Sequence, residues 1–300
     1  MLGFFLILGA CLLWALDTLI RYPLLGSGVD AFSIVFYEHL ILSIIFVVVF
    51  FKALPKLWKS KKSHMFYFFM IGGVGSALAT LAFTKAFTLL NPSLVILLQK
   101  FQPVVAIFLA SIILKEKIEK NFIIWAFICL LGGIFISYED ILKLSFNEKD
   151  FSELVMHPGA FQGYLLTIFS IVGWGASTVY GKKLLKAGYQ DEQVLAGRFI
   201  LGFICLLPFI PFHSLLFTHS IEVYGKVSLM VLVSGLIAMY LFYHGLRKIS
   251  ARACSLTEMF FPFMAIIVNW LFLGATLSPL QIFGGCLLLL GSIVIQLKNY

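Results

Sequence analysis

The chain contains the same pattern twice, and this repeat limits the folds that it can adopt. Residues 82–118 align with residues 241–277 at an offset of 159, and residues further upstream align at an offset of 160. Identical pairs at these offsets include Trp14 with Trp174, Phe83 with Phe242, and Pro103 with Pro262. Each copy holds an odd number of apolar segments, so the two copies run in opposite directions if the segments cross a bilayer. The sequence therefore predicts an inverted repeat.

Composition indicates that the apolar segments belong in a membrane. Hydrophobic residues make up 61% of the chain and charged residues 12%, whereas about a quarter of the residues in a soluble domain are charged. Ten segments have the length of about 20 residues that an apolar helix needs to cross a bilayer. They are 2–21, 31–52, 65–89, 93–114, 120–138, 160–182, 192–212, 225–246, 253–273 and 278–297. We therefore expect an all-α membrane protein with ten transmembrane helices in a five-plus-five inverted repeat, in which repeats 1–140 and 160–300 flank a linker (141–159).

The basic residues indicate how these helices are oriented. Fifteen lysine and arginine residues fall on the side of the membrane that holds both termini, and five fall on the opposite side. Because the cytoplasmic side carries the excess of basic residues, we expect both termini in the cytoplasm and the acidic stretch 139–159 outside. That stretch is interpreted as a solvated linker, with an acidic lip that attracts substrate as the alternative. The net charge of +8 follows from the loops, so the expected partner is the lipid bilayer and not a nucleic acid.

Several kinds of site are disfavoured by the sequence. The five cysteines lie singly in apolar runs without CxxC spacing, which predicts buried thiols and neither a disulfide nor a metal site. The six histidines are scattered and form no HExxH motif, so we expect no cofactor, and an intramembrane enzyme is the weaker hypothesis. A channel would show a repeated polar pore lining, which the sequence lacks. The leading hypothesis is a secondary transporter with two mirrored halves.

Polar residues inside the apolar segments indicate where a substrate passes, because an ionisable group there is costly unless it is paired or hydrated. Glu258 is the strongest candidate, and its counterpart in the first repeat is Gln99. A proline four residues after each of them, Pro103 or Pro262, predicts a kink beside these groups. We expect Glu258, Gln99 and Gln102 to bind substrate or a coupled proton. The alternative is a hydrogen bond that only locks the eighth and ninth helices together.

Four further charged residues lie within the segments or at their ends. Asp17 and Arg21 are four residues apart and are expected to pair, and Asp17 is also a candidate substrate ligand. Lys100 is another candidate ligand, but a direct pair with Glu258 is disfavoured because about 10 Å separates the two backbones along the membrane normal. Arg198 is expected to extend to the cytoplasmic interface.

Aromatic side chains complete the candidate site. Trp14 and Trp174 are counterparts in the repeat, and small residues surround the second of them. This pattern favours two rings that face a cavity and stack on an aromatic or cationic substrate, and helix packing is the alternative. The sixth and eighth helices add amphipathic candidates, with an interfacial aromatic belt as the alternative. These candidates are Tyr180, Tyr240, Tyr243 and His244.

Several motifs resemble one family of transporters. In the second half these are FYHGLRKISA at residues 242–251 and QIFGG at residues 281–285. In the first half the corresponding motifs are LKE at residues 114–116 and the pair Gly132-Gly133. Together they resemble the drug/metabolite transporter superfamily, EamA-like type, over nearly the whole chain. One departure is that Lys115-Glu116 stands where the family has Gly-Glu.

The resemblance implies a carrier of small metabolites, often an exporter, in a bacterial inner membrane. It also implies a cavity lined mainly by the first, third, fourth, sixth, eighth and ninth helices. Mixed charges and aromatic rings favour an amino acid or a related amphipathic solute, for which the resemblance implies export. We expect alternating access, with either facilitated release or exchange for a proton. The alternative is uptake of a nucleoside-like cofactor or another metabolite.

Overall fold

A computed structural model describes residues 1–90, 95, 98–136, 138, 159–210, 219–273 and 278–298. The α-helices in the first half are α1 (Leu2–Gly26), α2 (Ala31–Val48), α3 (Leu54–Trp58), α4 (Lys62–Phe69), α5 (Ala79–Ala86), α7 (Gln102–Ile113) and α8 (Lys120–Ile136). Those in the second half are α11 (Ala160–Lys186), α12 (Asp191–Leu206), α13 (Ile221–Met230), α14 (Ala238–Lys248), α15 (Ala251–Glu258), α16 (Phe260–Leu273) and α17 (Pro279–Lys298). Two π-helical segments, η2 (Met70–Leu78) and η4 (Val231–Ile237), and two 3₁₀ turns, η1 (Phe51–Ala53) and η3 (Leu207–Phe209), complete the described elements.

The predicted all-α membrane fold is confirmed. Eight continuous helical stretches are long and apolar enough to cross a membrane, and the two shorter apolar helices α7 and α8 stand at the places of the fourth and fifth spans. Part of the expected fourth span, at 91–94 and 96–97, lies outside the described residues, as does the expected linker up to residue 158.

The repeat is visible in the irregular parts of the helices. The π-helical segments η2 and η4 occupy equivalent positions in the third and eighth spans. The fourth and ninth spans are also broken at equivalent positions, just before α7 and at Met259. Each break lies in the turn before a proline, which has no N–H to donate and clashes with the carbonyl four residues earlier. The predicted kinks are therefore breaks, and the two carbonyls concerned belong to Gln99 and Glu258.

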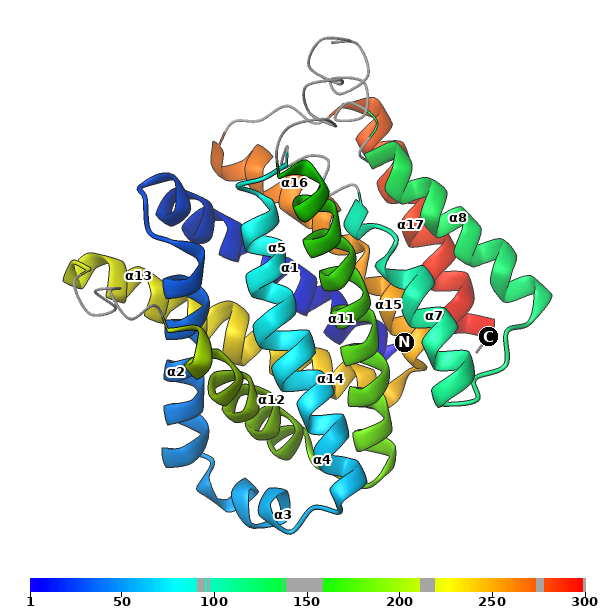
Figure 1. Cartoon of the computed structure of the whole chain (residues 1–300). Coiled ribbons are helices and arrows are strands. Elements are labelled where there is room, and N and C mark those ends of the chain that lie inside the picture. Colours follow the sequence, from blue (N-terminus) through cyan, green and yellow to red (C-terminus); the bar gives the residue numbers. More distant parts are fainter. Residues whose placement is uncertain are drawn as a thin grey trace.

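The first helix of each half packs against helices of the other half. Helix α1 packs against α14, and its counterpart α11 packs against η2 and α5. Helices α8 and α17 form a separate pair on one flank (Figure 1). Gly132 and Gly284 meet at their crossing, where a Cβ on either glycine would lie 2.7 or 2.6 Å from the carbonyl oxygen of the other. Small residues allow membrane helices to approach in this way.

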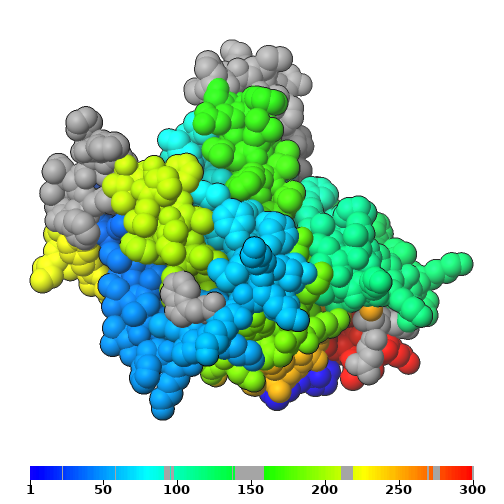
Figure 2. Space-filling view, turned by 60° about the horizontal axis from the view of Figure 1, so that its bottom comes forward, coloured from blue at the N-terminus to red at the C-terminus, as the bar shows by residue number. Residues whose placement is uncertain are grey.

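Atoms near the two termini lie side by side on one face, dark blue and red in Figure 2. We call this side the termini end and the side where α1 and α5 finish and α11 begins the connector end. Cys11, Cys129 and Cys254 are buried as expected, but Cys205 is half-buried and Cys286 is exposed. The expectation of burial was wrong for Cys286, because α17 turns its glycine face, and not this thiol, toward α8.

Candidate substrate-binding site

A cavity of about 240 Å³ lies between the two halves. It is lined by the six predicted spans, the first, third, fourth, sixth, eighth and ninth, and additionally by α2 and α12. No residue of α8 or α17 lines it. The cavity therefore lies inside the ring of eight spans, and the α8–α17 pair stands beside that ring.

The cavity extends toward the connector end. Its lining reaches Leu25 and Phe87, in the last turns of the first and third spans. At the termini end the helices close behind it, where Ile7, Tyr243 and Leu246 are completely buried. The Lys182 ammonium group joins α11 to the last turn of α14 there, donating to the carbonyl oxygens of residues 246 and 247 at 2.7 and 3.0 Å.

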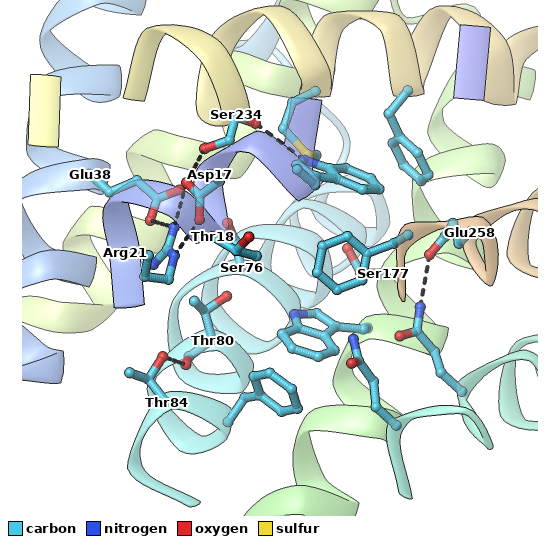
Figure 3. A pocket seen from close by; sticks show the side chains of 18 of the residues that line it. Asp17, Thr18, Arg21, Glu38, Ser76, Thr80, Thr84, Ser177, Ser234 and Glu258 are labelled. Carbon is cyan, nitrogen blue, oxygen red and sulfur yellow. Dashed lines mark hydrogen bonds and ion pairs between the residues drawn. The ribbon is translucent and has the colours of Figure 1, made fainter. Parts of the chain in front are cut away.

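One side of the cavity carries a network of ion pairs (Figure 3). The predicted Asp17–Arg21 pair is confirmed, with 2.6 Å between Nε and Oδ2. The same guanidinium group reaches Glu38 on α2, with 3.3 Å between Nη2 and Oε2. Ser234 on η4 donates to the other oxygen of Asp17 at 2.6 Å. The network thus places two carboxylates around one guanidinium group.

Glu258 lies on the other side of the cavity (Figure 3). Its Oε2 accepts a hydrogen bond from Gln102 at 2.8 Å, and its Oε1 accepts one from Thr178 at 3.2 Å. These partners lie on α7 and α11, and neither belongs to the eighth span that the alternative named. No lysine, arginine or histidine of the described residues lies within ion-pair distance of Glu258.

Arg198 also lines the cavity, and its expected extension to the interface was wrong. The side chain is buried, and its Nη1 donates to the Ser177 hydroxyl at 2.8 Å and to the Tyr243 hydroxyl at 3.2 Å. Helix α12 turns this residue toward α11 and α14, where two hydroxyl groups replace the water that a lipid-facing arginine would seek. The guanidinium group is therefore a component of the cavity wall.

Aromatic pairs related by the repeat stand on the cavity wall. Trp14 contacts Phe242, with 5.6 Å between ring centroids, and Trp174 contacts Phe83, with 4.7 Å. All four residues line the cavity. Each pair joins a tryptophan of one half to a phenylalanine of the other, so the rings couple the halves as well as facing the open space.

The remaining candidates fall into two groups. Gln99 lines the main cavity, and Lys100 lines a smaller one of about 40 Å³ that lies beside Glu258. Tyr180, Tyr240, Tyr243 and His244 do not line the main cavity. Tyr180 stacks on Tyr67, Tyr240 donates to Glu192, His244 bonds to Asp191, and Tyr243 contacts the cavity only through Arg198. The face of α14 that carries Tyr240, Tyr243 and His244 is thus turned mostly toward α12 and not toward the cavity.

Several lining residues were missed in the sequence. Ser76, Thr80 and Thr84 form a hydroxyl stripe on the third span (Figure 3). Their spacing of four places them on one helix face, and this signal was present in the sequence. Phe83 and Phe242 were visible only as matched positions of the repeat. Among the described residues, no group of three potential metal ligands is found.

Comparison with known proteins agrees with this architecture. The model of the EamA-like transporter family matches residues 1–138 and 161–297. The chain is 30% identical to a protein named riboflavin transporter ImpX from Fusobacterium nucleatum, over 99% of this chain and 98% of that protein. It is 23% identical to an uncharacterized transporter from Archaeoglobus fulgidus, over 66% of this chain and 65% of that protein. A crystal structure that is 16% identical shares the fold, with a TM-score of 0.76 over 99% of this chain and 97% of that one. The chain belongs to the EamA-like transporter family, and it is a membrane transporter and not an enzyme.

Proposed function

We propose that this transporter carries a flat aromatic cofactor of the riboflavin class. The observation that carries the proposal is the pair of aromatic contacts, Trp14–Phe242 and Trp174–Phe83, on the wall of one cavity. A flat ring gains both apolar contact and favourable ring geometry from such neighbours. The relative named as a riboflavin transporter supports the same substrate class.

The polar lining suits the rest of such a molecule. Riboflavin joins a flat ring system, with polar atoms along its edges, to a chain of hydroxyl groups. The hydroxyl stripe Ser76, Thr80 and Thr84 leads from the centre of the cavity toward the connector end. Hydroxyl groups both donate and accept hydrogen bonds, so this stripe is a suitable partner for a polyol chain.

The proposed mechanism is alternating access around this cavity, in the direction of uptake. The cavity reaches the connector end, and the excess of basic residues predicts that this end lies outside the cell. The broken fourth and ninth spans beside the cavity are the kind of element around which inverted repeats bind their substrates. Fusing a reporter to each terminus and inserting one into the connector tests this orientation. A connector reporter that is active only in the cytoplasm would contradict it.

A proton is the proposed coupling ion, with Glu258 as its carrier. A carboxylate without a basic partner is costly at membrane depth, and binding of a proton removes the charge. In proteoliposomes we expect an imposed pH gradient to stimulate uptake, and we expect Glu258→Gln to abolish the stimulation. Equal stimulation of this variant would exclude Glu258 as the proton carrier.

Export of an amino acid is the second candidate. Arg198 and Glu258 both line the cavity without forming an ion pair with each other. An amino acid could place its carboxylate on the first and its ammonium group on the second. The aromatic pairs make an aromatic amino acid the best representative of this class.

Counterflow in proteoliposomes separates the two candidates. The purified full chain is reconstituted, loaded with unlabelled riboflavin and given a trace of labelled riboflavin outside. Saturable uptake that internal riboflavin accelerates is expected, whereas tryptophan and phenylalanine in excess should not compete. Counterflow of an aromatic amino acid, together with no riboflavin flux above that of empty liposomes, would overturn the proposal in favour of the second candidate.

A further inference from the structure

We propose that Arg198 and Glu258 form a two-point subsite that reads the imide edge of the substrate ring, Arg198 donating to a ring carbonyl and Glu258 accepting from the ring N–H. This inference rests on the proposed function and names the part of the flavin that the transporter recognises. The imide of a flavin ring presents a carbonyl, an N–H group and a second carbonyl in a row, so it needs a donor beside an acceptor.

Each of the two side chains is hydrogen-bonded to one of two consecutive residues of α11. Ser177 accepts a hydrogen bond from Arg198 Nη1 at 2.8 Å, and Thr178 donates one to Glu258 Oε1 at 3.2 Å. All four residues line the same cavity. A donor and an acceptor that line one cavity are therefore both anchored to the same turn of α11.

Arg198 retains donor capacity in this arrangement. Arg198 is 9% exposed, and its hydrogen bonds to Ser177 and Tyr243 both start from Nη1. Among the described residues its Nε has no hydrogen-bond partner, and none accepts from Nη2. A buried donor without a partner is costly, so a carbonyl oxygen of the substrate that reaches this guanidinium group gains a hydrogen bond.

The first half of the repeat shows why this wall is open to a ligand. Glu38 corresponds to Arg198 in the repeat, and it is paired with Arg21. The second-half counterpart of Arg21 is Gly181, which has no side chain to pair with anything. Glu38 is thus ion-paired within its own half, whereas neither Arg198 nor Glu258 forms an ion pair with another described residue. The two similar halves differ at the place where a substrate needs polar contacts.

The test measures how strongly each flavin analogue binds to the purified full chain. Bound riboflavin is detected by the quenching of its fluorescence, and each analogue is added as a competitor. N3-methylriboflavin lacks the imide N–H, and the 2-thio and 4-thio analogues carry sulfur, a weaker acceptor, in place of one carbonyl oxygen. We expect N3-methylriboflavin to bind at least about tenfold more weakly than riboflavin to the native chain. In Glu258→Ala this ratio should fall toward one, and in Arg198→Met the preference of oxygen over sulfur should disappear. Glu222→Gln, which alters an exposed carboxylate on α13, is the matched control and should keep both preferences.

Ratios measured within one variant do not depend on how much of it is folded. If Glu258→Ala or Arg198→Met does not fold, Thr178→Val and Ser177→Ala remove one supporting hydrogen bond each, and they should reduce the same two preferences. Preferences that are equal in the native chain and in these variants would overturn the subsite while leaving riboflavin as the substrate. Absence of riboflavin binding to the native chain would instead contradict the proposed function.

Discussion

At the scale of the residue, charges in this membrane protein are placed by their neighbours and not by depth alone. Asp17 and Arg21 were predicted to pair because a spacing of four puts them on one helix face. Glu38 joins them from α2, and nothing in the spacing along the chain indicated this. The predicted position of the Arg198 side chain was wrong for the same reason, because its partners, Ser177 and Tyr243, lie on other helices. Depth along a helix is readable from the sequence, but the direction of a side chain around it depends on packing.

Because Asp17 and Glu38 share the guanidinium group of Arg21, the three residues are expected to contribute unequally to the stability of the protein. Removing Arg21 leaves the carboxylates of Asp17 and Glu38 facing each other without compensation. We therefore predict that Arg21→Gln lowers the free energy of unfolding by about 2 kcal/mol or more. Glu38→Gln should cost less than about 1 kcal/mol, because Arg21 keeps its shorter contact with Asp17. Reversible unfolding in mixed micelles measures both, and equal losses would contradict the account.

Lys115, where the sequence departs from the family pattern, has a strained backbone conformation. Its φ of 55° lies in the left-handed region, where a glycine, the residue of the family pattern, carries no Cβ penalty. The following residue, Glu116, accepts hydrogen bonds from the backbone N–H groups of Ala251 and Arg252 at the start of α15. The turn at Lys115 is therefore needed to bring Glu116 to that helix end.

Lys115→Gly should relieve this strain. We expect the variant to gain about 0.5–1 kcal/mol of stability, the left-handed penalty less the greater chain entropy of glycine. Lys117→Gly is the control, since Lys117 is not among the residues with positive φ, and it should lose stability or leave it unchanged. Thermal unfolding of both variants in detergent gives the sign, and a lower melting temperature for Lys115→Gly would contradict the prediction.

At the scale of the element, much of the fold was predictable and the reason is physical. The length of an apolar segment shows whether it can span the membrane. The constant offset between the two copies shows which spans of the two repeats correspond. The prolines placed the breaks beside Gln99 and Glu258 correctly, because proline acts through its own chain neighbours. The π-helical segments η2 and η4 were not predicted. They depend on contacts with the opposite half, which the spacing of apolar residues within one span does not encode.

The α8–α17 pair should affect stability more than binding. A Cβ at Gly284 would lie 2.6 Å from a carbonyl oxygen of α8, whereas nothing lies within 4 Å of a Cβ at Gly225 on α13. We predict that Gly284→Ala destabilises the protein by about 1–3 kcal/mol and that Gly225→Ala stabilises it by up to about 1 kcal/mol.

Because α8 and α17 do not line the cavity, Gly284→Ala that remains folded should keep the native affinity for the proposed substrate, riboflavin. Melting temperature and fluorescence quenching are measured on the same preparation. An affinity that falls in proportion to stability would show that the pair shapes the site after all.

At the scale of the whole molecule, the two ends of the cavity are equivalent by sequence and different in structure. Lys182 joins the last turns of α11 and α14 at the termini end. The repeat equates these two turns with the last turns of the first and third spans, where Leu25 and Phe87 line the cavity. The two helix ends are therefore in contact at the termini end, whereas their counterparts at the connector end line the cavity. Alternating access requires the two ends to exchange these roles.

The Lys182 contact should then control how often the termini end opens. Cys254 lies between that end and Glu258, is completely buried and contacts the carboxylate, with 3.6 Å between Sγ and Oε1. It becomes accessible only if the closed end separates. In a chain that keeps Cys254 and has alanine at the other four cysteines, we predict that Lys182→Met speeds labelling of Cys254 by a charged thiol reagent applied from the termini end. The increase should be at least about tenfold, which corresponds to about 1.4 kcal/mol of lost preference for the closed state.

Lys186→Met is the matched control, because Lys186 lies one turn further along α11 and is exposed. It should leave the labelling rate unchanged. Counterflow of riboflavin, the proposed substrate, on the same vesicles distinguishes a shifted equilibrium, which keeps saturable exchange, from a collapsed fold, which does not. If Lys182→Met exchanges riboflavin normally while Cys254 stays as protected as in the parent chain, the last turns of α11 and α14 do not separate during transport. The opening must then be sought at the other contact of this end, between Glu116 and the start of α15.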